Sequence, residues 1–417
     1  MTGDIYRKRT VFTSLLMGLL LIVVSDALVA QPQESAHVTV TEPVGLSRAD
    51  EVITFPLQLE QEQSALVAID RSNGDTIYCQ VLQNHLPETT LDSVLQVEVA
   101  FPVRIAANET RQFDLILTRN KKEPPTDLTV QGSGTELVIE NNYFRADLTR
   151  SAENAVKDHA SGQLRELHLK NHDTVLKRGE NRIHWAPTFG KRGVEYYKTI
   201  ATWDNPEQTS VQAGPYLVRT IRSDTGPDHP EIQVTAQYQF YGNLPYFTFY
   251  SEMVFQEGAW IHLLRNDEMT MDSLFTHVAF RRKNGEVVDL PFSERYDLLQ
   301  DHPIANDDPW LCFYHSELGY AFGGIRLQYD NTNTYGSASP MENPHTHVSD
   351  GAGGGKYWNR RLIYDDWLHV PEGSRYREKN AYIVFSTDER ERFQTIEYYA
   401  ERLRNPLDVR IIYNEKN

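Results

Sequence analysis

Apolar and polar residues alternate over many short stretches of this chain, and a period of two residues is typical of β-strands with one buried face. Within the first 120 residues, turns separate six such stretches, and Ser72-Asn73-Gly74-Asp75 is the strongest hairpin signal among those turns. The pattern predicts a small β module with strands at 37–40, 52–59, 65–70, 77–82, 94–103 and 111–118.

A polar stretch, Lys121–Thr126, follows this module and contains two adjacent prolines. Proline interrupts regular secondary structure, so the stretch predicts a linker. We therefore place the N-terminal β module at 31–120, the linker at 121–133 and a second domain at 134–417.

In the second domain the alternation returns in longer stretches, bounded by turns such as Gly242-Asn243-Leu244-Pro245. Long strands in one large domain predict an antiparallel sandwich, and the predicted fold class is all-β. The main predicted strands are 212–223, 231–241, 246–255, 277–281, 319–327, 360–367 and 381–385.

One segment near the C-terminus has helical spacing instead. Ser386 with Glu389 predicts a capping box at its start, and Asn405-Pro406 ends it. Its apolar stripe, which we interpret as a packing surface, consists of Phe393, Ile396, Tyr399, Ala400 and Leu403. A last strand is predicted at 407–413.

The composition is that of a globular protein large enough for two domains, with 417 residues, 40% hydrophobic and 24% charged. The formal net charge of −17 disfavours nucleic acid as a partner, because nucleic-acid binding needs a basic surface. The 22 Tyr, 17 Phe and 6 Trp suit an all-β protein, and they also suit sites where sugars stack on aromatic rings.

The N-terminus has the pattern of a secretion signal. Arg7-Lys8-Arg9 precedes the apolar run Val11–Val24, and small residues follow it, so we predict a signal peptide at 1–30. The run of about 14 residues is short for a membrane span, which needs about 20. We expect a periplasmic or secreted protein with no membrane span after signal removal; the alternative is a single anchoring helix. Cys79 and Cys312 fall in different predicted domains, which favours two buried thiols over a disulfide.

The sequence L-V-I-E-N-N-Y-F-R-A-D-L at Leu137–Leu148, followed by G-Q-L-R-E-L-H-L-K at Gly162–Lys170, resembles the opening of galactose-mutarotase-like supersandwich domains. Such domains recur in polysaccharide lyases and glycosidases. The preceding segments Val44–Leu57 and Val97–Thr110 resemble the small barrel that the YetA-like exo-rhamnogalacturonan lyase group places before this domain. Ulvan-lyase-type proteins are a vaguer likeness. The resemblance implies a small N-terminal β-barrel or sandwich module and a large antiparallel supersandwich with one C-terminal helix. The YetA-like group continues into a helical toroid that has no counterpart here, so the resemblance assigns no catalytic residue.

The segment Asn343–Asp366, N-P-H-T-H-V-S-D-G-A-G-G-G-K-Y-W-N-R-R-L-I-Y-D-D, carries the densest candidate chemistry. Uronate lyases cleave by β-elimination, which needs a group that neutralises the substrate carboxylate, a base and an acid. Arginine grips carboxylates with two donors, and histidine exchanges protons near neutral pH. If 356–364 is a strand, one face carries three of the predicted catalytic residues and the other face carries Trp358 and Arg360. The predicted catalytic residues are His345, His347, Tyr357, Asn359 and Arg361. The alternative is a solvated hairpin with an exposed polar tip.

A second segment, His184–Lys198, interleaves aromatic and basic residues around glycines. It predicts a loop that stacks on sugars and binds carboxylates, and the alternative is an irregular loop folded onto the sandwich. Arg219 interrupts an apolar strand, so it needs a buried partner or a ligand. The predicted substrate-binding residues are Trp358, Arg360, His184, Trp185, Tyr197, Lys198 and Arg219.

We predict a secreted polysaccharide lyase that cleaves an anionic, uronic-acid-containing polysaccharide of the ulvan or rhamnogalacturonan type. The pair His345-x-His347 leaves a divalent metal open, but no third ligand is visible and no cofactor is predicted. The alternatives are a glycoside hydrolase or sugar epimerase on the same scaffold, or a non-catalytic glycan-binding accessory protein. A hydrolase would use a carboxylate pair, for which Asp267-Glu268, Asp307-Asp308 and Asp365-Asp366 are available.

Overall fold

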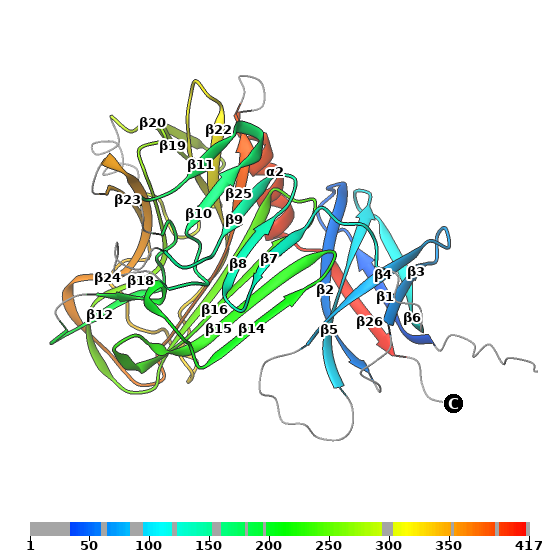
Figure 1. Cartoon of the computed structure of the whole chain (residues 1–417), viewed down its shortest axis with the longest axis horizontal. Coiled ribbons are helices and arrows are strands. Elements are labelled where there is room, and N and C mark those ends of the chain that lie inside the picture. The colour runs from blue at the N-terminus through cyan, green and yellow to red at the C-terminus, as the bar shows by residue number, and fades with distance from the viewer. Residues whose placement is uncertain are drawn as a thin grey trace, which may run out of the picture.

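The computed structural model describes residues 34–59, 65–83, 95–118, 123–151, 160–179, 182–194, 197–293, 303–351, 354–387 and 392–413. The predicted signal peptide, 1–30, lies outside these residues. Within them the chain is all-β, as predicted, with antiparallel sheets and the helix α2 (Gln394–Arg404) (Figure 1). None of the helices in these ranges is long and apolar enough to cross a membrane.

The N-terminal strands curl into a barrel-like module, at the right of Figure 1. Its hairpin between β3 (Ala65–Asp70) and β4 (Thr76–Gln83) turns at Gly74, whose positive φ of 78° explains the glycine at this position. The final strand β26 pairs with β1, so the chain returns to this module at its C-terminal end, whereas the sequence placed 407–413 in the second domain. The sheet order is β2 (Arg48–Leu59), β5 (Leu95–Ile105), β4 (Thr76–Gln83), β3 (Ala65–Asp70), β6 (Thr110–Thr118), β1 (Glu34–Thr41) and β26 (Asp408–Tyr413).

A nine-stranded sheet forms the base of the second domain. Its order is β14 (Gln208–Ala213), β15 (Leu217–Gly226), β16 (His229–Tyr241), β17 (Tyr246–Phe255), β25 (Arg375–Ser386), β22 (Tyr320–Asp330), β21 (Trp310–Tyr314), β19 (His277–Arg281) and β20 (Val287–Pro291).

Two five-stranded sheets complete the sandwich. One has the order β11 (Thr174–Leu176), β10 (Glu166–Leu169), β9 (Phe144–Asp147), β8 (Glu136–Glu140) and β7 (Thr129–Ser133). The other, called the β18–β24 sheet below, has the order β13 (Lys198–Thr199), β12 (Thr188–Lys191), β18 (Ala259–Met271), β24 (Lys356–Val370) and β23 (Thr346–Asp350). Short 3-10 helices occupy Lys170–His172 and Ile200–Thr202.

The main hydrophobic core lies between these sheets. It joins Phe144 of β9, Phe247 of β17, Phe322 of β22 and Trp358 of β24, all fully buried. One face of the β18–β24 sheet therefore packs on the nine-stranded sheet, and its other face is the outer surface of the sandwich, at the left of Figure 1.

Helix α2 packs its predicted stripe between the two units. Ile396 and Ala400 are buried in a cluster that also contains Leu82 of the N-terminal module and Leu217 of β15. The predicted capping box is wrong, because Ser386 is the last residue of β25 and the helix is preceded by Phe393, which makes no side-chain cap. Burial of the apolar stripe stabilises this helix, because packing of an apolar face provides most of the stability of a helix in a protein.

Both cysteines are buried and free, Cys79 in β4 and Cys312 in β21, which confirms the expectation of two separate thiols.

Candidate functional site

A bulge in β18 decides which side chains share the outer face of the β18–β24 sheet. Arg265 lies opposite Arg361 of β24, and Glu268 lies opposite Asn359. From Arg265 to Glu268 β18 advances by three residues, while β24 advances by only two, from Arg361 to Asn359. The extra residue in β18, near Asn266, is a bulge, and such a bulge turns the side chains that follow it to the other face. Arg265 and Glu268 therefore lie on the same side, where the guanidinium donates a hydrogen bond to the carboxylate at 2.7 Å.

The outer face holds two arginines side by side. Arg361 donates from Nε to Asn359 Oδ1 at 2.5 Å and from Nη2 to Ser349 Oγ at 3.0 Å. The guanidinium groups of Arg361 and Arg265 lie over the ring of Tyr364, at 4.4 and 5.9 Å from its centroid. The two positive charges are held close together by hydrogen bonds and by the aromatic ring.

Glu268 is buried beneath this surface. Besides Arg265, the Thr188 hydroxyl of β12 approaches its carboxylate at 3.4 Å. Burial raises the pKa of Glu268, and the charge and hydrogen bond of Arg265 act in the opposite direction. The backbone N–H of Trp185 donates to the Glu268 carbonyl at 3.1 Å, so the second predicted segment reaches the site at this point.

The predicted histidines lie next to Asn359. His347 of β23 is directly opposite Asn359, and its Nε2 is 3.1 Å from the amide nitrogen of Asn343. Burial, followed by the charge of Arg361, lowers the pKa of His347 to about 4, so its imidazole is neutral at neutral pH. His345 lies in the same loop, where its backbone N–H donates to Asn343 Oδ1 at 2.8 Å.

Tyr357 lies one rung further along the same face. It is opposite Thr270 of β18 on one side and Ser349 of β23 on the other. The structure thus brings Tyr357, Asn359 and Arg361 of β24 together with His347 of the adjacent strand β23.

Several buried nitrogens of the outer face and of the loop before β23 have no hydrogen-bond partner among the described residues. Within the described ranges, no hydrogen bond is made by Arg265 Nε, Asn359 Nδ2, His345 Nδ1 or His262 Nδ1. Buried polar atoms in proteins almost always have a partner, and an unpartnered group costs free energy. These nitrogens are free to bond water or a polar ligand.

Trp358 lies on the opposite, inner face of β24. Its indole N–H donates to the buried carboxyl of Asp267 at 3.1 Å, and its ring packs against Phe313 and Phe322 at centroid distances of 4.9 and 5.6 Å. Burial raises the pKa of Asp267 to about 8, and the nearby Glu378 carboxylate acts in the same direction. A ligand on the outer face does not reach Trp358.

Arg360 is also on the inner face. Its guanidinium lies 3.3 Å from Glu378 and 3.2 Å from the side-chain oxygen of Asn266, and Nε donates to the Pro344 carbonyl at 3.0 Å. These contacts engage the side chain inside the sandwich. The structure places neither Trp358 nor Arg360 with the outer cluster.

The glycine loop between β23 and β24 is packed against an arginine. A Cβ at Gly355 would lie 2.7 Å from Arg178 Nη1, and a Cβ at Gly351 would lie 3.2 Å from Arg178 Nη2. These two glycines therefore permit a close approach of Arg178 to the backbone.

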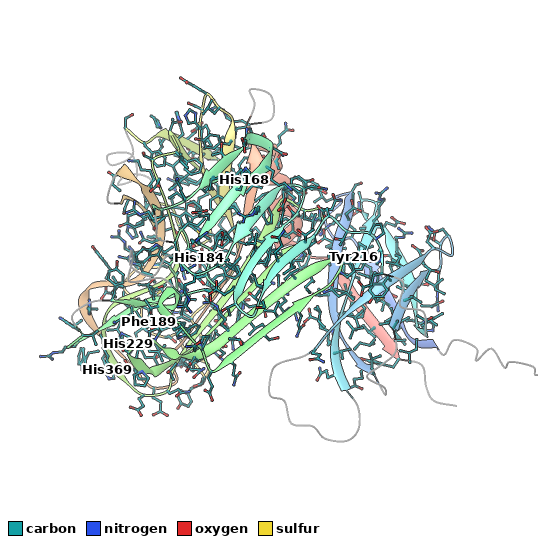
Figure 2. The ribbon with its side chains drawn as sticks, viewed as in Figure 1. His168, His184, Phe189, Tyr216, His229 and His369 are labelled. Atoms are coloured by element: carbon teal, nitrogen blue, oxygen red, sulfur yellow. The ribbon has the colours of Figure 1, made fainter. Side chains whose placement is uncertain are left out.

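The remaining predicted substrate-binding residues are dispersed. His184 is fully buried, 2.5 Å from the Tyr238 hydroxyl, in the interior that Figure 2 shows. Arg219 pairs with Glu98 of the N-terminal module at 2.7 Å. Both lie away from the outer face.

Trp185 and Tyr197 remain close to each other, with ring centroids 6.4 Å apart. Lys198 pairs with Asp228 at 2.7 Å. Trp185 and Tyr197 are therefore the members of the second segment that border the outer face.

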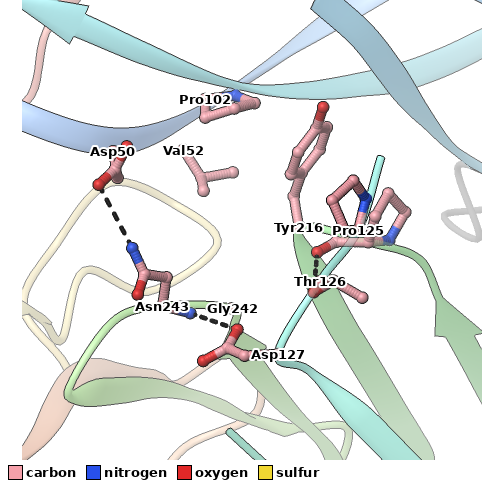
Figure 3. Close-up of a pocket in the computed structure, with 10 residues that line it drawn as sticks. Asp50, Val52, Pro102, Pro125, Thr126, Asp127, Tyr216, Gly242 and Asn243 are labelled. Atoms are coloured by element: carbon pink, nitrogen blue, oxygen red, sulfur yellow. Dashed lines mark hydrogen bonds between the residues drawn. The ribbon is translucent and has the colours of Figure 1, made fainter. Parts of the chain in front are cut away.

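A cavity lies between the two units, apart from the outer face. It is a cavity of about 450 Å³ in which Asn243 donates from its backbone to Asp127 at 2.8 Å and from its side chain to Asp50 at 3.3 Å (Figure 3). Its carboxylates are thus engaged in holding the turn before β17 and the linker. The cavity is lined by Asp50, Val52, Pro102, Pro125, Thr126, Asp127, Pro215, Tyr216, Gly242 and Asn243.

His345 and His347 would need at least one further ligand to hold a metal ion. Among the side chains that the structure describes, no group of three or more His, Cys, Asp or Glu residues is arranged to hold a metal ion.

No protein-family model matches this sequence, and no curated protein matches it. Among solved structures, a protein in the glycosyl hydrolase family 38 from Enterococcus faecalis is similar, with a TM-score of 0.55, 12% identity, and coverage of 92% of this chain and 48% of that chain. An alpha-mannosidase from Enterococcus faecalis V583 has a TM-score of 0.55 and 11% identity, and the match covers 91% of this chain and 46% of that chain. The chain spans about half the length of these proteins. At this level of identity the likeness shows that the fold is shared.

Proposed function

We propose that this chain is an exported carbohydrate-active protein that binds an acidic glycan on the outer face of the β18–β24 sheet and cleaves it by β-elimination. The observation that carries the proposal is the placement of Arg265 and Arg361 beside Asn359, whose side-chain nitrogen is buried and makes no hydrogen bond within the described ranges. Two guanidinium groups and an amide donor form a binding site suited to a uronate carboxylate.

The positive charge of this site comes from these two arginines. The lysines that the sequence places nearby are engaged elsewhere, Lys356 with Asp350 and Lys191 with Glu231. A carboxylate held by Arg265 and Arg361 would have its charge neutralised, which acidifies the adjacent C5–H and stabilises the enolate-like transition state.

His347 is the proposed base. Its imidazole is unprotonated at neutral pH, as a base must be before the reaction, and it lies on the rung of Asn359, next to the proposed carboxylate site. Tyr357, one rung further, is the proposed acid that protonates the leaving oxygen. Glu268 is a positioning residue, because its carboxylate accepts a hydrogen bond from Arg265 and fixes the direction of that guanidinium.

Glycoside hydrolysis is the second candidate. The two similar solved structures carry the names of a glycosyl hydrolase family and an alpha-mannosidase. Glu268 favours this candidate, because a carboxyl group whose pKa is raised by burial is suited to be a general acid. The two reactions leave different products, so they separate in one experiment.

The experiment is incubation of the full chain with rhamnogalacturonan, ulvan and alginate. Elimination is read from the ultraviolet absorbance of the unsaturated uronate product, and hydrolysis from new reducing ends without that absorbance. We expect the absorbance to rise with wild type and to be lost in Arg361→Ala. The control is Arg410→Ala, which removes an exposed arginine of β26 in the other module.

New reducing ends without the ultraviolet absorbance would show that the protein is a hydrolase and not a lyase. Binding with neither product would leave a glycan-binding accessory protein. Equal turnover by wild type and Arg361→Ala would refute the placement of the site on this face.

A further inference from the structure

The outer face of β18 and β24 continues beyond the arginines as a row of aromatic rungs. Trp260 lies opposite His369, with ring centroids 5.3 Å apart, at the end of the sheet where Figure 2 labels His369. The His262 and Trp367 rings are 4.9 Å apart. Next comes Tyr364, which lies against both arginines of the proposed site. We call Trp260, His262, Tyr364, Trp367 and His369 the aromatic row.

These side chains are unusually open to solvent for their type. Trp260 is 51% exposed, Trp367 48% and Tyr364 40%. Among the described residues, the other exposed aromatic side chains are Tyr197, which borders the same sheet, Tyr335, whose ring lies against Gly373 in the turn after β24, and Tyr413 of β26 in the N-terminal module. Exposed apolar surface that gathers on one face marks a binding surface.

The local backbone supports this arrangement. A Cβ at Gly190 of β12 would lie 2.9 Å from His262 Cε1, so the glycine permits the His262 ring to lie across the neighbouring strand. A Cβ at Gly258 would lie 3.2 Å from His369 Nε2. Both imidazoles thus lie close against the backbone and hold the tryptophans at their sides.

The chemistry of the row favours a glycan over a protein as its occupant. Each exposed ring has an imidazole or a guanidinium at its side, so flat apolar faces alternate with hydrogen-bonding groups. The face of an aromatic ring carries negative charge density, which attracts the C–H groups of a sugar, while the polar neighbours serve its hydroxyls. The row also runs directly into the pair of arginines.

The length of the face sets the size of the ligand. The eight steps along β18 from Trp260 to Glu268, at about 3.3 Å per residue, span about 25 Å. This is several times the size of one sugar ring. A monosaccharide would contact the arginines and leave the aromatic row uncovered.

We propose that the aromatic row is an extended binding surface for a polymeric acidic glycan, which lies along β18 and β24 with one carboxylate at Arg265 and Arg361 and successive rings on Tyr364, Trp367 and Trp260. This inference rests on the proposed function and adds that the substrate is a chain of several sugars, bound in a defined direction along the strands.

The test compares ligands of two lengths. Isothermal titration calorimetry measures binding of galacturonate dimer and hexamer to wild type, to the double variant Trp260→Ala/Trp367→Ala and to Tyr413→Ala as the control for an exposed aromatic in the N-terminal module. We expect wild type and Tyr413→Ala to bind the hexamer at least tenfold more tightly than the dimer. The double variant should lose about tenfold in hexamer affinity and nothing in dimer affinity, given the usual contribution of two aromatic contacts.

The outcomes separate the two proposals. Equal affinity of wild type for both lengths, or a hexamer affinity unchanged in the double variant, would overturn the extended surface while binding of the dimer sustains the carboxylate site. Failure of wild type to bind either ligand would overturn both. Circular dichroism of the double variant at the wild-type intensity excludes loss of folding as the cause of a lost affinity.

Discussion

Trp358 and Trp367 lie on the same strand, β24, but on opposite faces of the sheet, so their replacement separates a packing role from a binding role. Trp358 is fully buried and Trp367 is 48% exposed. We predict that Trp358→Phe lowers stability without a direct effect on the outer face, and that Trp367→Ala weakens glycan binding with little effect on stability.

The magnitude for Trp358 follows from its contacts. Phenylalanine keeps part of the packing on Phe313 and Phe322 but removes the N–H that donates to Asp267. Loss of a partner for a buried polar group costs about 1–3 kcal/mol, and the smaller ring adds a cavity term, so about 3 kcal/mol is expected in total. For Trp367→Ala, a surface change away from such contacts costs within about 0.5 kcal/mol.

The assay is urea unfolding followed by near-ultraviolet circular dichroism, which reports the packing of the aromatic core. With an m-value of about 3 kcal/mol/M, the midpoint of Trp358→Phe falls by about 1 M and that of Trp367→Ala stays within about 0.2 M. A wild-type midpoint for Trp358→Phe together with lost glycan binding would refute the reasoning, because it would make Trp358 a ligand contact.

Three further predictions concern pH and the junction between the two units. The pKa of His347 is lowered from 6.5 to about 4. The neutral imidazole therefore makes its full contribution to stability above pH 6.5, and this contribution is lost as the pH falls from 6.5 to 4. Urea midpoints measured across this range should fall less steeply in His347→Gln than in wild type. A Cβ at Gly214 would collide with the side-chain amide of Gln80, which forms hydrogen bonds with the backbone of Tyr216 and Leu217. Gly214→Ala should therefore lower the free energy of unfolding by about 2 kcal/mol, measured as a lower Tm. Gly324→Ala is the control, because a Cβ at Gly324 meets only ordinary contacts at 3.8 Å. Arg402→Met leaves the buried Glu51 carboxylate without its main partner. This variant should lose about 3 kcal/mol of stability in urea unfolding, and the double variant Arg402→Met/Glu51→Leu should regain part of that loss. A double variant less stable than the single one would contradict this account.

Most strands of this protein can be predicted from its sequence. Each sheet buries one face, and apolar residues therefore alternate with polar residues along its strands. The hairpin at Gly74 is predictable from its turn residues, and the apolar stripe of α2 from its helical spacing; both signals are local. The position of β26 was not predictable, since its pairing with β1 joins residues at opposite ends of the chain and no local pattern encodes such a contact. The start of α2 was missed because Ser386, a good capping residue, is used by a strand.

The alternation of side chains along β24 can be predicted from the sequence, but which of its faces is buried cannot. Alternation along β24 correctly put Tyr357, Asn359 and Arg361 on one face. The same alternation placed Trp358 and Arg360 on the other face, but the sequence did not say that this face is the interior. Two adjacent arginines on one strand thus have opposite environments, one paired with the buried Glu378 and one beside Asn359.

Glu268 could not be assigned to the site from the sequence, in which it is only one member of the adjacent acids Asp267-Glu268. In a regular strand, residues three apart point to opposite faces, so Arg265 and Glu268 would be separated by the sheet. The bulge at Asn266 removes this separation and sends Asp267 to the interior instead, where it bonds Trp358 and Tyr382. The adjacent acids Asp267 and Glu268 thus have separate roles, one in the core and one beneath the arginines. A pair of carboxylates in the sequence is therefore no indication of a pair in the site, and this argues against assigning the two residues to a common hydrolytic mechanism.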